Sequence, residues 1–201
     1  MMMDTVTAEN TDTPYHRALR DFAAGNYKDA LAKYQDIVDN APKDRIGLLG
    51  LAMSYEKLGR DKEAVESYQR YLVVEPANEE VASRMLQKAM ALPKDEARAR
   101  VESFITAGVQ RPDYLSALAE LSSAAGENEK ALKYAVLAVE QSPNTAMYKL
   151  NAAVLADRLK RKGEAAALYE QFLAIFERSP VVMEVSIAAI RERMRYLQSG
   201  L

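Results

Sequence analysis

The chain of 201 residues has no cysteine, no tryptophan and one histidine, His16. Disulfides, thiolate nucleophiles and a zinc site of the usual His/Cys kind within one chain are therefore excluded. Glycine (8) and proline (7) are scarce, while alanine, leucine, glutamate, lysine and arginine dominate. Because these residues favour helix, the composition predicts an all-α fold.

Two further absences concern membranes. No apolar run approaches the ~18 residues that a membrane span needs. The first 14 residues hold no positive cluster followed by the apolar stretch of an export signal. We expect a soluble protein without membrane insertion, in the cytoplasm, or in the bacterial periplasm if an export leader was removed.

The charge is nearly balanced, with a formal net value of −2. Residues 1–145 carry 18 basic and 23 acidic groups, and residues 146–201 carry 9 basic and 6 acidic groups. This modest asymmetry gives no general attraction to nucleic acid, and at physiological salt such fields reach only about 8 Å. We expect no nucleic-acid partner.

An internal repeat is the strongest pattern present. Four residues recur after a shift of 34: Gly25, Ala30, Tyr34 and Pro42 return as Gly59, Ala64, Tyr68 and Pro76. A period of this length in a helix-forming composition predicts helical hairpins stacked into a solenoid.

The second repeat shows why these residue types are needed. Ala52 and Ala64 have no bulk beyond Cβ, so the two helices of a hairpin can approach closely. Gly59 supplies the positive φ that a short turn between helices often requires. Pro76 cannot continue the second helix and so separates one hairpin from the next.

The second repeat resembles the tetratricopeptide repeat, because its small, large and turn positions fall in register together. This resemblance implies a right-handed superhelix of antiparallel helix hairpins. Five units are expected, followed by a C-terminal capping helix. The expected boundaries are a flexible tail at 1–13, an array at 14–182 with units of about 11–44, 45–78, 79–111, 112–145 and 146–182, and the capping helix at 183–201. The third unit is the weakest, since Pro93 splits it early and the glycine turn is missing.

Signs of chemistry are few. The chain has no glycine-rich phosphate loop and no calcium loop, so we expect neither enzyme activity nor a cofactor or metal. The basic run at Arg158, Lys160, Arg161 and Lys162 is interpreted as a solvated turn, because no aromatic residues interrupt it. Binding of an acidic or nucleotide ligand there stays an alternative, and such binding would fall steeply with salt.

The resemblance also implies a binding surface. In tetratricopeptide arrays the first helix of each hairpin lines a concave groove. Transferred to this chain, the groove offers an apolar set and two polar contacts: Tyr15, Leu19, Ile46, Leu49 and Met53, then Arg84 and Gln87. The same face continues in the later units through Asp113, Ser116, Glu120, Ser123, Met147, Leu150 and Val154. Methionine adapts to imperfect shapes, which suits a hydrophobic or amphipathic segment.

The expected function is thus a non-catalytic scaffold that binds a protein or peptide partner in the groove, as an adaptor, assembly factor or chaperone. Two alternatives stay open. The chain could be a structural oligomer that self-associates through its convex face or its last helix. The tail Met1–Val6 could also occupy the groove until a partner displaces it.

Overall fold

The computed structural model describes residues 12–106, 110–180 and 185–199, which contain eleven α-helices and no strand. These helices form two compact units that divide between Pro93 and Lys94. The predicted all-α class is confirmed. The division falls inside the range 79–111 that the sequence assigns to the third hairpin, so the two helices of this range belong to different units.

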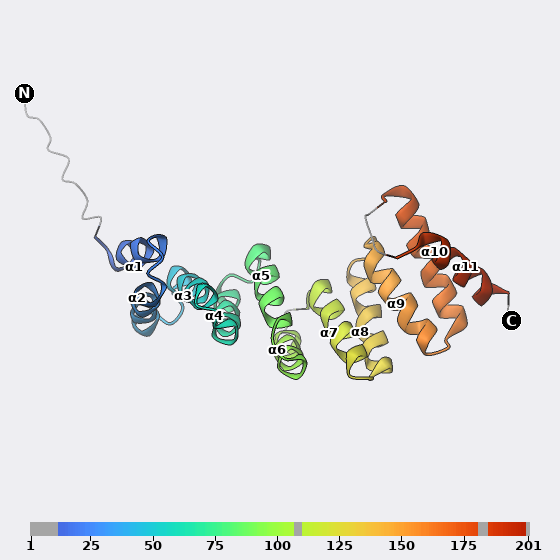
Figure 1. Ribbon diagram of the computed structural model, residues 1–201, viewed down its shortest axis with the longest axis horizontal. Coiled ribbons are helices and arrows are strands. Elements are labelled where there is room, and N and C mark those ends of the chain that lie inside the picture. The colour runs from blue at the N-terminus through green and yellow to red at the C-terminus, as the bar shows by residue number, and fades with distance from the viewer. Residues whose placement is uncertain (1–11, 107–109, 181–184, 200–201) are drawn as a thin grey trace, which may run out of the picture. The chain divides into compact units, whose positions relative to one another are not determined.

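The first unit holds two hairpins and one further helix (Figure 1). Its helices are α1 (Pro14–Ala23), α2 (Tyr27–Asn40), α3 (Arg45–Lys57), α4 (Asp61–Val74) and α5 (Glu79–Met90). Each helix packs against the next, and α1 also contacts α3. The first helices of successive hairpins therefore lie next to each other, as the repeat pattern predicts.

The second unit holds α6 (Lys94–Thr106), α7 (Pro112–Ala124), α8 (Asn128–Gln141), α9 (Ala146–Arg158), α10 (Lys162–Arg178) and α11 (Ile187–Gln198). Helices α7 and α8 form one hairpin and α9 and α10 another, while α6 packs against α7 and α11 against α10 (Figure 1). Helix α10 is 17 residues long against 14 for α8, so the second helix of the last hairpin runs about one turn further.

The turns inside the hairpins share one backbone conformation. Gly25, Gly59 and Gly126 have φ values of +80°, +70° and +80°, the left-handed region that glycine enters at little steric cost. Lys160 stands at the same place in the α9–α10 turn, 34 residues after Gly126, with φ of 58°. It is the one non-glycine residue with positive φ in the described part of the chain.

The cores of the two units differ in side-chain size. In the first unit Tyr34 and Tyr68 are buried against small residues, and Ala52 and Ala64 are fully buried as predicted. The core of the second unit is rich in alanine, with larger side chains such as Tyr169 and Phe172 between the helices. Small residues let helix axes approach, so the large side chains fill the remaining space.

Two parts of the predicted boundaries fall outside the described residues. The tail is described only at residues 12 and 13, and the last predicted segment lacks 183–184 and 200–201. Within this segment α11 buries Ile190 and Leu197 against the rest of the unit, and the hydroxyl of Ser186 accepts a hydrogen bond from the Ala189 N–H at its start.

Candidate partner-binding site

The first helices of the first unit have an outward face that carries exposed apolar side chains. Helix α3 buries Leu48, Leu51 and Ala52. Residues three or four apart share a helix face, so Ile46, Leu49 and Met53 lie on another side of α3. Ile46 is 52% exposed, whereas Leu49 and Met53 are half-buried.

Leu19 on α1 is 56% exposed, and Leu19 and Ile46 are two of the most exposed large apolar residues described. Together with the half-buried Leu49 and Met53 they make the surface that we call the first-unit face. The structure thus leaves the apolar part of the predicted set at least partly accessible.

Among the predicted contact residues, Tyr15 also contributes a hydrogen bond to the structure of the first unit. Its hydroxyl donates to Asp44 Oδ2 at 2.8 Å, and the carboxylate of Asp44 also accepts the Gly47 N–H at 2.7 Å to cap α3. The hydrogen bond to Asp44 raises the pKa of Tyr15 because it stabilises the neutral phenol. The ring lines a hollow of about 570 Å³ together with residues of α2 such as Lys33 and Ile37.

Arg84 is already engaged within the first unit. Its guanidinium lies 3.8 Å from the Glu56 carboxylate and 3.5 Å from that of Glu80. Glu56 also accepts the Tyr68 hydroxyl at 2.6 Å, and burial together with this carboxylate raises the pKa of Tyr68. The charge of Arg84 is therefore compensated, while the predicted contact Gln87 is exposed.

The second unit contains a larger hollow, of about 690 Å³, between α7, α9 and α11. We call it the second-unit hollow. Its walls are mainly apolar. Helices α7 and α9 contribute Ser116, Glu120 and Ser123, then Met147, Leu150 and Val154, and α11 contributes Ala189, Ile190 and Arg193, with Val185 two residues before its start.

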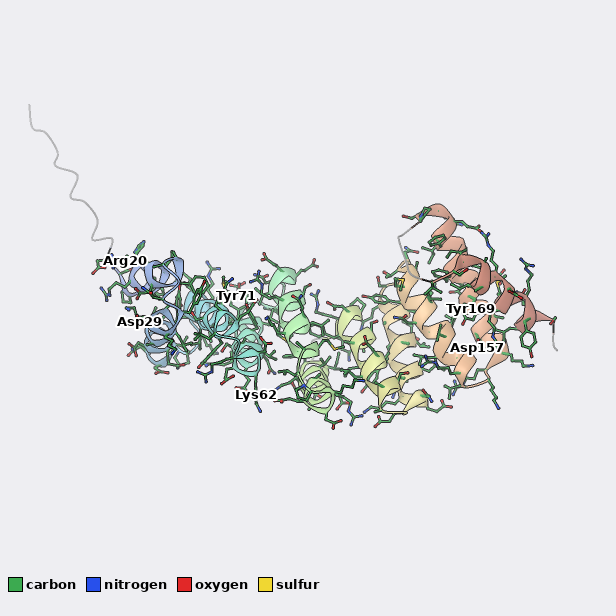
Figure 2. All side chains as sticks on the ribbon, viewed as in Figure 1. Arg20, Asp29, Lys62, Tyr71, Asp157 and Tyr169 are labelled. Atoms are coloured by element: carbon green, nitrogen blue, oxygen red, sulfur yellow. The ribbon has the colours of Figure 1, made fainter. Side chains whose placement is uncertain are left out.

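An ion pair fixes the third wall of this hollow. The Arg193 guanidinium donates two hydrogen bonds of 2.7 Å to the two carboxylate oxygens of Asp157 on α9. These bonds hold the pKa of Asp157 below its ordinary value, and the neighbouring Tyr169 hydroxyl acts in the same direction. Figure 2 labels Asp157 and Tyr169 on α9 and α10. The pair positions α11 beside the hollow.

Two charged side chains at the hollow make no ion pair with any residue that the structure describes. Arg158, at the end of α9, donates to the Ser123 hydroxyl of α7 at 3.0 Å and makes no ion pair with any described residue. Glu120 is exposed on α7, one turn before Ser123, and it too has no ion-pair partner in the described ranges.

Sequence reasoning located part of this hollow and missed the rest. Six of the seven face positions that the repeat register assigns to the fourth and fifth units line it, Asp113 being the exception. The wall from α11 was missed, because that helix was interpreted as a cap or as a surface for self-association and not as part of the groove. Arg158 was missed too, since it belongs to a run interpreted as a solvated turn. The signal that could have found it is its place one turn after Val154 on the same helix.

The described residues show no group of three or more His, Asp or Glu side chains placed to hold a metal ion. His16 lies at the start of α1, where its Nδ1 is 2.8 Å from the Thr13 hydroxyl. Over the same residues, none of the helices combines the length and apolarity that crossing a membrane demands.

Comparison with known proteins agrees with the repeat pattern. Residues 15–80 match the family model "Tetratricopeptide repeat". No curated protein matches the chain significantly in sequence. Among solved structures, a crystal structure of MamA is 17% identical with a TM-score of 0.56, covering 89% of this chain and 98% of that chain.

Further structures of MamA show the same likeness. MamA AMB-1 is 19% identical with a TM-score of 0.55, covering 88% of this chain and 93% of its own. MamA from Desulfovibrio magneticus RS-1 is 19% identical with a TM-score of 0.50, covering 84% and 96%. At such identities these likenesses show a shared fold. Residues 15–80 therefore carry the tetratricopeptide repeat pattern, and the chain shares the all-α solenoid fold of these structures.

Proposed function

We propose that this protein is a non-catalytic scaffold that binds a hydrophobic or amphipathic segment of a partner protein on the outward face of its first helices. The tetratricopeptide fold supports a protein-interaction scaffold in general. The observation that carries the more specific proposal is the exposure of Leu19 and Ile46 beside Leu49 and Met53 on the first-unit face.

The size of this surface sets the expected effect. Complete burial of a leucine or isoleucine side chain contributes about 1.5–3 kcal/mol, so covering the exposed half of each contributes about 1 kcal/mol. A partner that covers both gains about 2 kcal/mol, which corresponds to roughly 30-fold in affinity.

The test replaces the two most exposed residues, Leu19→Glu together with Ile46→Glu, because exposed positions tolerate charge without loss of the fold. A partner captured with the intact chain and identified by mass spectrometry is then purified and titrated by calorimetry. We expect at least 30-fold weaker binding with unchanged helical circular dichroism. The matched control is Val73→Glu, which adds a charge at a 74% exposed site on a second helix, α4. Equal affinity of the double variant and the control would contradict the proposal.

Self-association is a second candidate function, favoured by an exposed aromatic residue outside the first-unit face, Tyr196 on α11, which is 46% exposed. Light scattering over a range of concentrations tests it. A mass that rises with concentration, and returns to that of one chain in the Tyr196→Glu variant, is the expected result for an oligomer.

A further inference from the structure

The second-unit hollow has the dimensions of a docking groove for a helix. Along α9 its lining residues recur every three or four positions, at Met147, Leu150, Val154 and Arg158. This line spans 11 residues, or about 16 Å at 1.5 Å per residue. A partner helix of three turns presents side chains at the same spacing, so its apolar stripe can follow the line.

The floor of the hollow is partly accessible apolar surface. Met147 is 40% exposed and Val154 is half-buried, whereas Leu150 is buried at 4%. A partner helix would therefore cover Met147 and Val154, while Leu150 supports them from below. Covering such contiguous apolar surface is the usual source of affinity at a groove of this kind.

The charges at the hollow specify which helix fits. Of the two arginines that line it, Arg193 is neutralised by Asp157, whereas Arg158 has only the Ser123 hydroxyl. A carboxylate placed at Arg158 would gain a charge-assisted hydrogen bond that the hydroxyl cannot match. Glu120 lies one turn before Ser123 on α7 and offers the opposite charge.

The rest of the basic run does not contribute to this pattern. Arg161 is paired with Glu129 and Glu164 on the second helices, and neither Lys160 nor Lys162 lines the hollow. Arg158 therefore differs from the other residues of the basic run, because it alone among them lines the hollow. Arg158 and Glu120 are thus two charges at the hollow that make no ion pair with a described residue, and they lie beside Ser123 and one helical turn before it on α7.

We infer that the second-unit hollow binds an amphipathic helix of a partner protein, with a carboxylate facing Arg158 and a lysine or arginine one turn away facing Glu120. The apolar stripe of this helix covers Met147 and Val154. This rests on the proposed function, a scaffold that binds partner segments on its first helices, and adds a second site with its own charge requirement, whose residues all belong to the second unit.

The test uses two stapled helical peptides of identical composition. Both carry a leucine stripe at helical spacing. In the first, a glutamate and a lysine one turn apart are placed to face Arg158 and Glu120, and in the second the two residues are exchanged. Stapling holds the helix before binding, so both peptides have the same ordering cost. Fluorescence anisotropy with the full chain measures the affinity of each.

We expect the first peptide to bind about tenfold more tightly than the second. Arg158→Ala should remove most of that preference, and Glu120→Lys combined with Arg158→Glu should reverse it. Met147→Glu, at an exposed position that leaves the fold intact, should weaken both peptides at least tenfold. The matched charge control is Lys160→Glu, which changes a basic residue of the adjacent turn outside the hollow and should leave both affinities unchanged.

Two results would overturn the inference: equal affinity for the two peptides, or binding that Met147→Glu leaves unaltered. An extended peptide of the same composition that binds more tightly than the stapled helix would also reject a helical partner. The Leu19→Glu and Ile46→Glu variant separates this site from the first-unit face. It should bind both peptides like the unmodified chain, whatever its effect on the partner of the first unit.

Discussion

Replacing Gly50 by alanine sets two energies of opposite sign against each other. Gly50 lies inside α3, where alanine is favoured over glycine by about 1 kcal/mol. A Cβ at this position, however, would lie 2.3, 2.4 and 2.5 Å from three ring atoms of Tyr34. Ordinary carbon contacts are about 3.5–4.0 Å long, so the ring would have to move by more than about 1 Å.

Tyr34 has no room for such a movement, because it is only 4% exposed in the packing of α2 against α3. Overpacking of a dense core costs about 1–3 kcal/mol, and sometimes more. Because the overlap at 2.3–2.5 Å is severe, its cost should exceed the gain in helix propensity, and we expect Gly50→Ala to lower the free energy of unfolding by up to about 2 kcal/mol. Urea unfolding followed by circular dichroism measures the change as a shift of the midpoint.

A second helical glycine provides the matched control. Gly163 lies in the first turn of α10, and nothing stands within 4 Å of the place its Cβ would take. Gly163→Ala should therefore stabilise by up to about 1 kcal/mol. In a Tyr34→Val background, which removes the ring atoms concerned, the cost of Gly50→Ala should largely disappear. Stabilisation by Gly50→Ala in the unmodified chain would refute the reasoning.

Two further predictions concern the second unit. Lys160→Gly should stabilise the chain by about 0.5–1 kcal/mol. A non-glycine residue in the left-handed region costs about 1–2 kcal/mol, and the larger backbone freedom of glycine in the unfolded chain offsets part of the energy recovered. Thermal unfolding measures the change, and a lower melting temperature would contradict the prediction. Asp157→Asn should speed amide exchange in α11, because the lowered pKa of Asp157 means that its pairing with Arg193 stabilises the fold fully only above the unfolded pKa of about 3.9. The stabilisation should be lost as pH falls through the lower folded pKa, so equal exchange in both chains at neutral pH would refute it.

The turns show what local sequence can predict. A glycine in the left-handed region solves a local steric problem, so Gly25, Gly59 and Gly126 could be assigned from spacing alone. Lys160 adopts the same conformation without being glycine. The repeat register predicts a turn at this position. It does not predict the strained backbone of Lys160, because the residue type gives no sign of a positive φ.

The close approach at Gly50 shows what local sequence cannot predict. A glycine in a helix interior normally only destabilises the helix, and no residue near position 50 in the sequence indicates which side chain packs against it. The reason for it is the Tyr34 ring, which comes from the preceding hairpin. Such a requirement exists only once the two helices are packed, so it becomes visible in the structure alone.

The candidate site divides in the same way. Face positions follow from helical periodicity, and this is why the sequence predicts Ser116, Met147 and Val154 for a groove surface, where the structure has the hollow. The orientation of α11 does not follow from periodicity. Its sequence is apolar on several sides, and packing selects Ile190 for the interior while Ala189 stays exposed.

The two surfaces also differ in how they can select a partner. On the first-unit face the nearby charge of Arg84 is compensated by Glu56 and Glu80, so discrimination there depends on apolar area, which distinguishes related segments only weakly. At the second-unit hollow Arg158 and Glu120 make no ion pair with a described residue, and a helix with the wrong order of charges would place like charges together. Because apolar contact supplies affinity and charge order supplies specificity, the second unit is the part of this chain that is better suited to distinguish one partner helix from another.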